Sequence, residues 1–256
     1  MMYISLIILF FIVGTIFGSF YNVVGYRIPK GESILYPSSH CTKCNHKLGP
    51  LELIPVLSYI FLGGKCKKCK KHISCFYPIF EFASGVLFAL SYVVFGLSLD
   101  CLLSIVFISM LLIIIISDYQ TMIIPDSVLI IFGVGILIIK YFIVGYPGIL
   151  YALLDGVIAF VFMLLLKLFG DFLFKKESMG GGDIKLLGIF GIMFGYMMAM
   201  FSVFLAALIG LPISLILLKK NKSHEIPFGP FLAAAAIIIL LLKFDCDSLI
   251  NLLIIH

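Results

Sequence analysis

The sequence is poor in charge and contains no tryptophan. Charged residues make up 12% of its 256 positions, about half the share that is usual in soluble domains, whereas 62% are hydrophobic. The core of a soluble protein could not hide so much apolar surface, so we expect an integral membrane protein. With tryptophan absent, anchoring at the membrane interface falls to the 12 Tyr and 25 Phe residues.

We also expect no cleavable secretory signal in the first residues of the sequence. Residues 4–24 are apolar, but no basic residue precedes them and no small-residue cleavage site ends a short apolar core. The stretch is long enough to cross a bilayer, so we expect a first transmembrane helix that is retained. The net charge of +5 does not indicate a nucleic-acid partner, because in a membrane protein the placement of charge matters more than its sum.

Apolar runs predict an all-α, polytopic transmembrane helix bundle of about eight spans. The one sizeable polar segment runs from Arg27 to Cys75, and no internal repeat or second, soluble domain is visible. The last three spans are short and closely joined. The spans are expected near 4–25, 78–98, 101–117, 124–143, 148–168, 184–199, 201–218 and 228–242.

The placement of lysine and arginine supports this count. Segments 26–75, 167–185 and 219–222 carry nine, four and three of the 18 basic residues, which leaves only Lys140 and Lys243. With the N-terminus outside, eight spans place all three segments on the cytoplasmic side, as the positive-inside rule requires. We therefore expect a multi-pass protein of the cytoplasmic (inner) membrane, whose loop lysines set topology and contact anionic lipid headgroups.

Four of the seven cysteines form two CxxC pairs, Cys41 with Cys44 and Cys66 with Cys69, and 21 residues separate the pairs. Each pair can place two thiolates on one metal ion, so together they complete a tetrahedral site. They fall in the loop assigned to the cytoplasm, where disulfides are disfavoured. The pattern predicts a structural zinc site without an open coordination position, and redox-active cysteines or chance are the alternatives.

Two aspartates are expected at the same edge of the membrane. Asp118 ends the third predicted span, and Asp183 opens the sixth after Gly180, Gly181 and Gly182. Each alone could be a solvated helix cap. As a pair, one carboxyl group can keep a proton while the other acts as a base on water, which is the chemistry of an aspartic protease. The glycines allow backbone and substrate to approach closely.

Two further aspartates are given structural roles. Asp126 follows Pro125, which fits a turn or the first turn of a helix. Asp155 lies inside the fifth predicted span, toward its outer half. A carboxyl group within the membrane is a functional candidate by default, but its distance from the other two favours packing or hydrogen bonding.

Four blocks stand out between residues 18 and 185. They are Gly18-Ser19-Phe20-Tyr21-Asn22-Val23 with Arg27-Ile28-Pro29; the two CxxC pairs with Ile54-Pro55, Tyr77-Pro78 and Glu81; Asp118 with Ile124-Pro125-Asp126; and Gly180-Gly181-Gly182-Asp183-Ile184-Lys185. In order and at compatible spacings, they resemble the blocks of the type 4 prepilin peptidases, bacterial leader peptidases of the GxGD aspartic protease class. A lone GxGD would be a weak signal, but the four together are specific. One departure is Thr42, where a proline is common in the family.

The resemblance implies two activities. Residues 99–256 would form a transmembrane aspartic peptidase domain, in which Asp118 and Asp183 remove the basic leader from type 4 prepilins and pseudopilins at the cytoplasmic face. Residues 1–98, with the first two spans and the zinc loop at 26–75, would form a methyltransferase part that N-methylates the new N-terminus with S-adenosylmethionine. No GxGxxG-type fingerprint is visible, so methylation rests on the resemblance alone and no cofactor-binding residues are predicted.

Two other functions fit parts of the pattern. A membrane transporter or an assembly scaffold could use the cysteine loop to dock a partner, but transporters hold charged groups near the bilayer midplane, whereas these carboxylates are expected at one edge. A protease with a substrate range like that of the signal peptide peptidases would keep the aspartate pair. The cysteine loop argues against it, because that loop marks the prepilin branch of the class.

Overall fold

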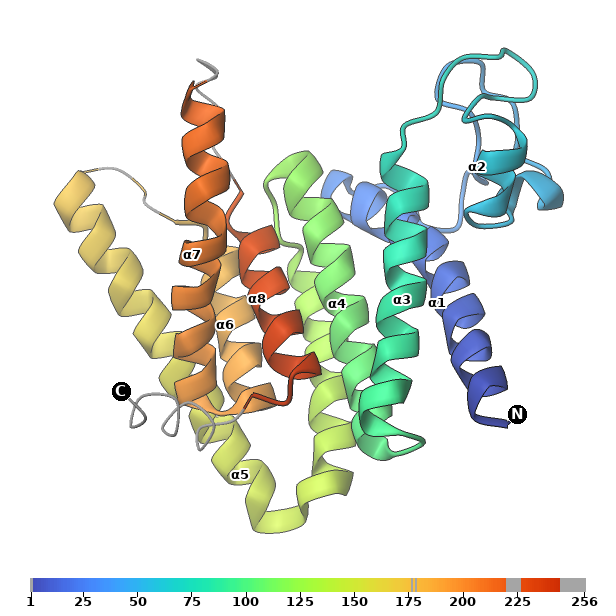
Figure 1. The fold of residues 1–256 in the computed structure, drawn as a ribbon. Coiled ribbons are helices and arrows are strands. Elements are labelled where there is room, and N and C mark those ends of the chain that lie inside the picture. Colours follow the sequence, from blue (N-terminus) through green and yellow to red (C-terminus); the bar gives the residue numbers. More distant parts are fainter. Residues whose placement is uncertain (1, 176, 178, 220–226, 245–256) are drawn as a thin grey trace. The chain divides into compact units, whose positions relative to one another are not determined.

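A computed structural model describes residues 2–175, 177, 179–219 and 227–244 (Figure 1). Within these residues the chain forms eight α-helices and two short 3-10 helices, and no strand beyond two isolated bridges. The expected all-α class is therefore confirmed. Lys176, Lys220 and Lys222, which contribute to the charge pattern, lie outside the described residues. The chain divides into two compact units, Met1–Cys101 (unit 1) and Leu102–His256 (unit 2).

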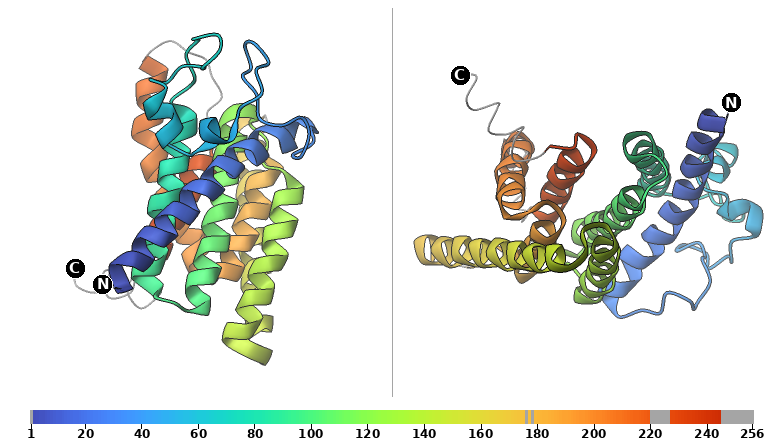
Figure 2. Two further views of the ribbon diagram at one scale, coloured as in Figure 1. Left: turned by 90° about the vertical axis from the view of Figure 1, so that its right-hand side faces the viewer. Right: turned by 90° about the horizontal axis from the view of Figure 1, so that it is seen from below.

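Unit 1 is built on two long helices that pack against each other, as both views in Figure 2 show. The helices meet at small residues. A Cβ atom added at Gly18 would lie 2.8 Å from the Cα of Glu81, and one added at Gly85 would lie 2.7 Å from Cγ2 of Thr15. Such contacts let two membrane helices approach at backbone distance. The elements are α1 (Met2–Arg27), η1 (Ile28–Lys30), η2 (Pro50–Leu53), α2 (Leu57–Phe61) and α3 (Phe76–Phe95).

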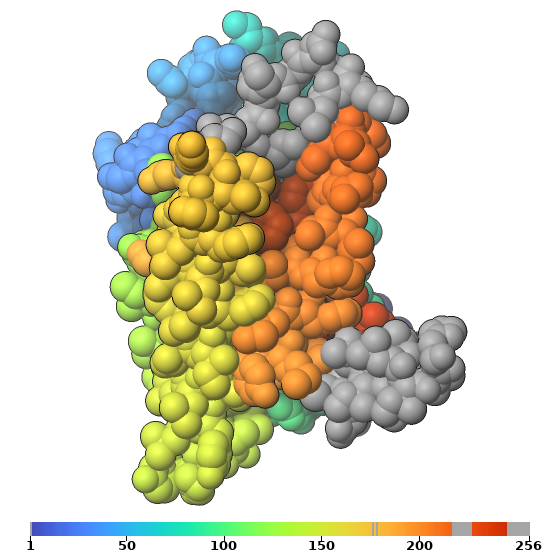
Figure 3. All heavy atoms as spheres, turned by 90° about the vertical axis from the view of Figure 1, so that its left-hand side faces the viewer, coloured from blue at the N-terminus to red at the C-terminus, as the bar shows by residue number. Residues whose placement is uncertain are grey.

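Unit 2 holds the remaining helices, with α4 beginning at the boundary between the units. They are α4 (Leu99–Thr121), α5 (Asp126–Phe174), α6 (Gly181–Phe194), α7 (Tyr196–Lys219) and α8 (Gly229–Leu241). The helical path of α5 is broken at Gly145 (φ 64°) and Tyr146, where Figure 1 shows a sharp turn between its two arms. The second arm of α5 and α7 lie side by side on one face of the unit (Figure 3).

Helices α4 and α6 form the centre of unit 2. Phe107 of α4 and Phe190 of α6 are completely buried, and their rings meet edge to face at 5.5 Å between centroids. By contrast, α5 exposes many large apolar side chains, among them Ile130, Phe142 and Phe172. Such a surface suits contact with lipid rather than water. The centre of the unit is thus formed by the two helices that each carry one of the key aspartates.

Five helices are long and apolar enough to cross a membrane: α1, α3, α4, α5 and α7. The protein is therefore a multi-pass membrane protein, and all eight predicted spans fall on helices. The count of eight is not confirmed. Two predicted spans are joined in α5, and α6 and α8 have 14 and 13 residues, fewer than the ~20 that a complete crossing needs.

Candidate active site and metal centre

The first aspartate lies in the last turn of α4. Asp118 is 6% exposed. The helix ends at Thr121, and Met122 adopts a left-handed conformation (φ 55°) while its N–H donates to the carbonyl of Asp118 at 2.9 Å. The Ser117 hydroxyl donates to the carbonyl of Ile123. These bonds reverse the chain where α4 ends and return Ile124 toward Asp118.

The second aspartate lies in the first turn of α6. Asp183 is 7% exposed, and Gly180 precedes the helix as its N-cap. The amides and the dipole of a helix N-terminus favour a negative charge there, but the burial of Asp183 and the nearby charge of Asp118 oppose it more strongly. Oδ2 of Asp183 lies beside Gly180, whereas its Oδ1 is buried without a hydrogen-bond partner among the described residues. One oxygen of this carboxyl group therefore contacts the helix N-cap, and the other is buried and free to bind a ligand.

Ile124 connects the two aspartates. A Cβ atom added at Gly182, next to Asp183, would lie 2.6 Å from Cβ of Ile124, and one added at Gly229 would lie 3.4 Å from its Cδ1 and 3.2 Å from Cγ of Asp118. The Asp118 carboxylate is also close enough to interact with the charge of Asp183. The two aspartates, far apart in the sequence, thus lie in one buried site of unit 2, where their like charges favour a shared proton.

Gly229, at the start of α8, is a site residue that the sequence reasoning missed. Its N–H donates a 3.0 Å hydrogen bond to Oδ2 of Asp118. Any side chain would place a Cβ atom only 2.5 Å from that oxygen, so glycine is required by close approach. A signal existed in the sequence, because Gly229 lies in a Pro-Phe-Gly-Pro run directly before an apolar helix.

The other two aspartates form contacts at the two ends of α6. Asp126 is the first residue of α5, and both its oxygens lie 2.7 Å from Nζ of Lys185 in an exposed ion pair. At the opposite end, Lys140 donates to the carbonyls of Ile192 and Met193. Asp155 interacts electrostatically with that lysine. These contacts fix both ends of α6.

The four paired cysteines occupy two turns of the same design. The N–H of Cys41 donates to the carbonyl of His46, and that of Cys66 donates to the carbonyl of Lys71, both at 2.9 Å. The residue after the second cysteine of each pair is left-handed, with φ 55° at Asn45 and 58° at Lys70. One isolated bridge closes each turn. The chain therefore presents two equivalent thiol pairs.

The two turns bring all four sulfur atoms together. The Sγ atoms of Cys41, Cys44, Cys66 and Cys69 lie within 4.8 Å of one another. Backbone amides favour the thiolate forms of two of them: the Lys43 amide lowers the pKa of Cys41 to about 7, and the Cys69 amide lowers the pKa of Cys66. The His46 amide acts in the same direction on Cys44, but desolvation and the neighbouring thiols outweigh it and raise the pKa of Cys44 to about 11. Thiolates are the metal-binding form, so this cluster can hold a metal ion. Cys75, the next cysteine along the chain, is exposed and lies outside the cluster.

Glu52 stabilises the first cysteine turn through two contacts. Its Oε2 accepts a 2.9 Å hydrogen bond from the N–H of Gly49 and lies 3.3 Å from Nε2 of His46. The Gly49 amide, followed by His46, lowers the pKa of the Glu52 carboxyl group. His46 therefore supports the loop rather than binding metal in this arrangement.

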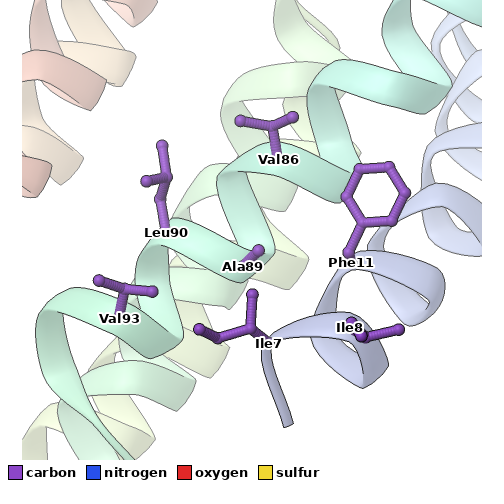
Figure 4. A pocket seen from close by; sticks show the side chains of 7 residues that line it. All are labelled: Ile7, Ile8, Phe11, Val86, Ala89, Leu90 and Val93. Atoms are coloured by element: carbon purple, nitrogen blue, oxygen red, sulfur yellow. The ribbon is translucent and has the colours of Figure 1, made fainter. Parts of the chain in front are cut away.

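An apolar hollow of about 290 Å³ lies between α1 and α3, away from the cysteine loop. Every side chain that lines it is hydrophobic (Figure 4). Such a lining offers no group that could bind a charged ligand or take part in catalysis. The residues are Ile7, Ile8, Phe11, Val86, Ala89, Leu90 and Val93. We assign no function to this hollow.

Comparisons with known proteins match two segments of the chain. Residues 12–95 match the bacterial peptidase A24 N-terminal domain, and residues 105–215 match the type IV leader peptidase family. No solved structure matches the chain.

Three curated relatives are each named prepilin leader peptidase/N-methyltransferase. The one from Bacillus subtilis is 37% identical over 232 residues, which cover 89% of this chain and 91% of the relative. Those from Pseudomonas putida and Pseudomonas aeruginosa are 32% and 31% identical over 88% and 90% of this chain and 86% and 88% of their own lengths. Identity at this level over nearly the whole length shows that the chain belongs to the type IV leader peptidase family.

Proposed function

We propose that this protein is an aspartic endopeptidase that removes the leader from type 4 prepilins and pseudopilins and then N-methylates the new N-terminus. The observation that carries the peptidase part is the buried pair Asp118 and Asp183, inside the segment that matches the leader peptidases. The relatives named for both activities cover most of both units.

The two aspartates differ in their surroundings, and the difference supports distinct roles. Asp118 receives the Gly229 N–H, a donor that favours a negatively charged acceptor. Oδ1 of Asp183 is buried without a partner, which is costly for a carboxylate but suits a carboxylic acid that can donate. Asp118 then takes a proton from the attacking water, and Asp183 donates to the carbonyl oxygen of the scissile peptide bond. As the carbon–nitrogen bond breaks, the leaving amine takes up the proton that Asp118 received from the water, and the re-forming carbonyl returns its proton to Asp183.

The cysteine cluster is proposed to bind zinc. Cys41 and Cys69, and Cys44 and Cys66, have Sγ atoms 3.9 Å apart, close to the ~3.8 Å edge of a tetrahedron with zinc–sulfur bonds of ~2.3 Å. Four thiolates fill the coordination sphere, so the ion would be structural and would hold the two turns together.

Methylation is proposed to belong to residues 1–98, and cleavage to residues 99–256. The leader peptidase match begins at residue 105, which leaves the preceding domain for the second activity in the relatives' names. When bound, S-adenosylmethionine would supply the methyl group.

The active site is proposed to face the cytoplasm, in the cytoplasmic membrane and with the N-terminus outside. The basic segments support this orientation. Asp118 follows the apolar length of α4, and Asp183 precedes that of α6, so both would lie at the cytoplasmic edge.

The test is cleavage of a cognate prepilin by purified protein in detergent, with S-adenosylmethionine present and products read by mass spectrometry. We expect a product that lacks the leader and carries the mass of one added methyl group. Leader removal without added mass would overturn the methyltransferase part alone. An uncut substrate, from a pilin matured in the same cell, would overturn the peptidase assignment and favour a scaffold.

A further inference from the structure

Glu81 is an acidic side chain within a membrane helix. It lies in the second turn of α3, one of the five helices suited to span a membrane. Its Oε2 accepts a 2.7 Å hydrogen bond from the N–H of Val56, and its carboxylate also accepts one from the side chain of Ser19 on α1. A charge in such a helix is costly and points to function.

The other acidic residues of unit 1 are placed differently. Glu52 is bound to Gly49 and His46 in the cysteine loop. Glu32 and Asp100 are exposed. Of the four acidic residues in unit 1, Glu81 alone lies where α1 and α3 meet.

The backbone is strained at Val56, the residue whose N–H donates to Glu81. Val56 has φ 62° and ψ −53°, a region that a β-branched residue rarely adopts. Such conformations cost about 1–3 kcal/mol and concentrate at functional sites. Here the unusual backbone directs an N–H at the carboxylate.

Unpaired polar groups lie one turn further along both helices. Asn22 follows Ser19 on α1 by three positions, and Ser84 follows Glu81 on α3 by three positions. Asn22 is 4% exposed and Ser84 is fully buried, yet Oδ1 of Asn22 and Oγ of Ser84 have no hydrogen-bond partner among the described residues. Because α1 and α3 are antiparallel, Asn22 lies one turn from Glu81 toward the cysteine loop. Ser84 lies on the opposite side and packs against Gly18. Buried polar atoms without partners are uncommon in proteins, so Oδ1 of Asn22 calls for a ligand or an equivalent partner on the loop side of Glu81.

Ser19 is one of the residues that line a hollow of about 370 Å³. Its lining mixes apolar side chains, such as Val23 and Leu35, with polar ones, such as Ser38 and Arg27. Arg27 donates to the carbonyl of Ser33 at 3.0 Å and so holds the loop that forms the far wall. The volume lies within the range of about 300–1,000 Å³ that is usual for small-molecule sites.

We propose that this corner of unit 1 is the methyl-transfer site, in which the hollow receives S-adenosylmethionine and Glu81 binds the N-terminal ammonium of the cut pilin. The proposal rests on the methyltransferase part of the proposed function. Ser19 borders the hollow and hydrogen-bonds to Glu81, so the two ligands would meet beside it.

Methyl transfer to the pilin N-terminus needs a proton acceptor beside the amine, and the carboxylate of Glu81 can serve as one. An α-ammonium group must lose a proton before its nitrogen can attack, and Glu81 would accept that proton. The nitrogen then takes the methyl group, and the electron pair of the broken carbon–sulfur bond stays on sulfur, which changes from a sulfonium to a neutral thioether. The product is a methylated, positively charged amine.

The first test is Glu81→Gln, which keeps an acceptor oxygen for Val56 but removes the charge. We expect the methylated fraction of the product to fall about tenfold or more, because a charged hydrogen bond is lost, while leader removal and bound metal persist. Glu32→Gln, an exposed change in the same unit, is the matched control. Unchanged methylation in Glu81→Gln, or loss of cleavage and metal together with methylation, would overturn the assignment of Glu81.

A binding measurement separates charge recognition from a structural effect. The probes are two mature pilin N-terminal peptides, one with a free amine and one N-acetylated. Wild-type protein should prefer the free amine, and Glu81→Gln should lose that preference. An equal preference in both proteins would overturn the proposal. If wild-type protein shows no methylation at all, the methyltransferase part of the proposed function fails instead.

The hollow is tested separately by Val23→Trp, which fills it without removing a partner of Glu81. Binding of S-adenosylhomocysteine, measured by equilibrium dialysis, should fall about tenfold or more, and cleavage should continue. Unchanged binding would show that the cofactor lies elsewhere.

Discussion

The amide of Gly229 donates a 3.0 Å hydrogen bond to Oδ2 of Asp118, a residue 111 positions earlier in the chain. A Cβ atom at position 229 would lie 2.5 Å from that oxygen. The start of α8 therefore forms part of the wall of the aspartate site, although the segment that matches the leader peptidases ends at residue 215.

Gly229→Ala should strongly reduce cleavage. The methyl group would push the Asp118 carboxylate away and weaken the amide hydrogen bond, and a displacement of about 1 Å at a catalytic group can cost ~100-fold. The measurement is kcat/KM for prepilin cleavage. Gly133→Ala is the matched control, because its Cβ atom would meet Ile189 at an ordinary 3.5 Å. Equal activity in the two variants would contradict this view of Gly229.

Asp118→Asn and Asp183→Asn should each reduce cleavage by about 1,000-fold or more, because neither amide can exchange a proton with water or the scissile bond. Detergent-purified variants should keep their bound metal, which shows that unit 1 remains folded. Asp126→Asn breaks an exposed ion pair with Lys185, which is worth at most about 1 kcal/mol, and should cleave almost normally. Full activity in either catalytic variant would refute the mechanism.

Local sequence pattern identified, for a physical reason, the two aspartates and the four cysteines that the structure brings together, and their catalytic and metal-binding roles stay predictions. Asp118 and Asp183 stand where apolar helices end or begin, and span ends can be read from hydropathy. The cysteine turns are short, so the spacing within each pair already places its two thiols on one turn, from which they can bind the same ion.

Contacts between residues far apart in the sequence could not be predicted from such local patterns. The role of Gly229 depends on a hydrogen bond between α8 and α4, and a glycine beside prolines indicates a turn without indicating its partner. The span count was uncertain for a similar reason. Two predicted spans correspond to the two arms of α5, which the break at Gly145 separates. The short α6 packs against its neighbours within unit 2, and its length does not suffice for a complete crossing.

Lys70→Gly should stabilise the second cysteine turn. Lys70 has φ 58°, and a left-handed conformation costs a residue with a Cβ atom about 1–2 kcal/mol. Metal release to a chelator should therefore be slower by roughly five- to thirtyfold if the turn must open first. Asn45→Gly, at the equivalent position with φ 55°, should have a smaller effect, because asparagine tolerates this region. Faster release from Lys70→Gly would show that the lysine side chain itself supports the turn.

Glu52→Gln should make the cysteine loop less stable than in wild type at neutral pH. This difference between the two proteins should disappear at acidic pH. The pKa of Glu52 is lowered in the folded loop, chiefly by the Gly49 amide, so its carboxylate stabilises the folded form above the ordinary value of 4.5. That contribution is lost as pH falls through the lowered pKa. Limited proteolysis of both proteins across this range is the measurement. A difference between them that grows on acidification would contradict the assignment.

Cys41→Ser should lower the metal content of the purified protein to near zero, and the same holds for each of the other three clustered cysteines. A serine hydroxyl is a poor replacement for a thiolate, and a four-thiolate site that loses one ligand loses its closed tetrahedral shell. Elemental analysis of the purified protein would measure zinc per chain. Cys75→Ser is the matched control, because Cys75 is exposed and outside the cluster, so its removal should leave the zinc in place. Zinc that remains stoichiometric in Cys41→Ser would mean that another group completes the site and that the four-cysteine assignment is wrong.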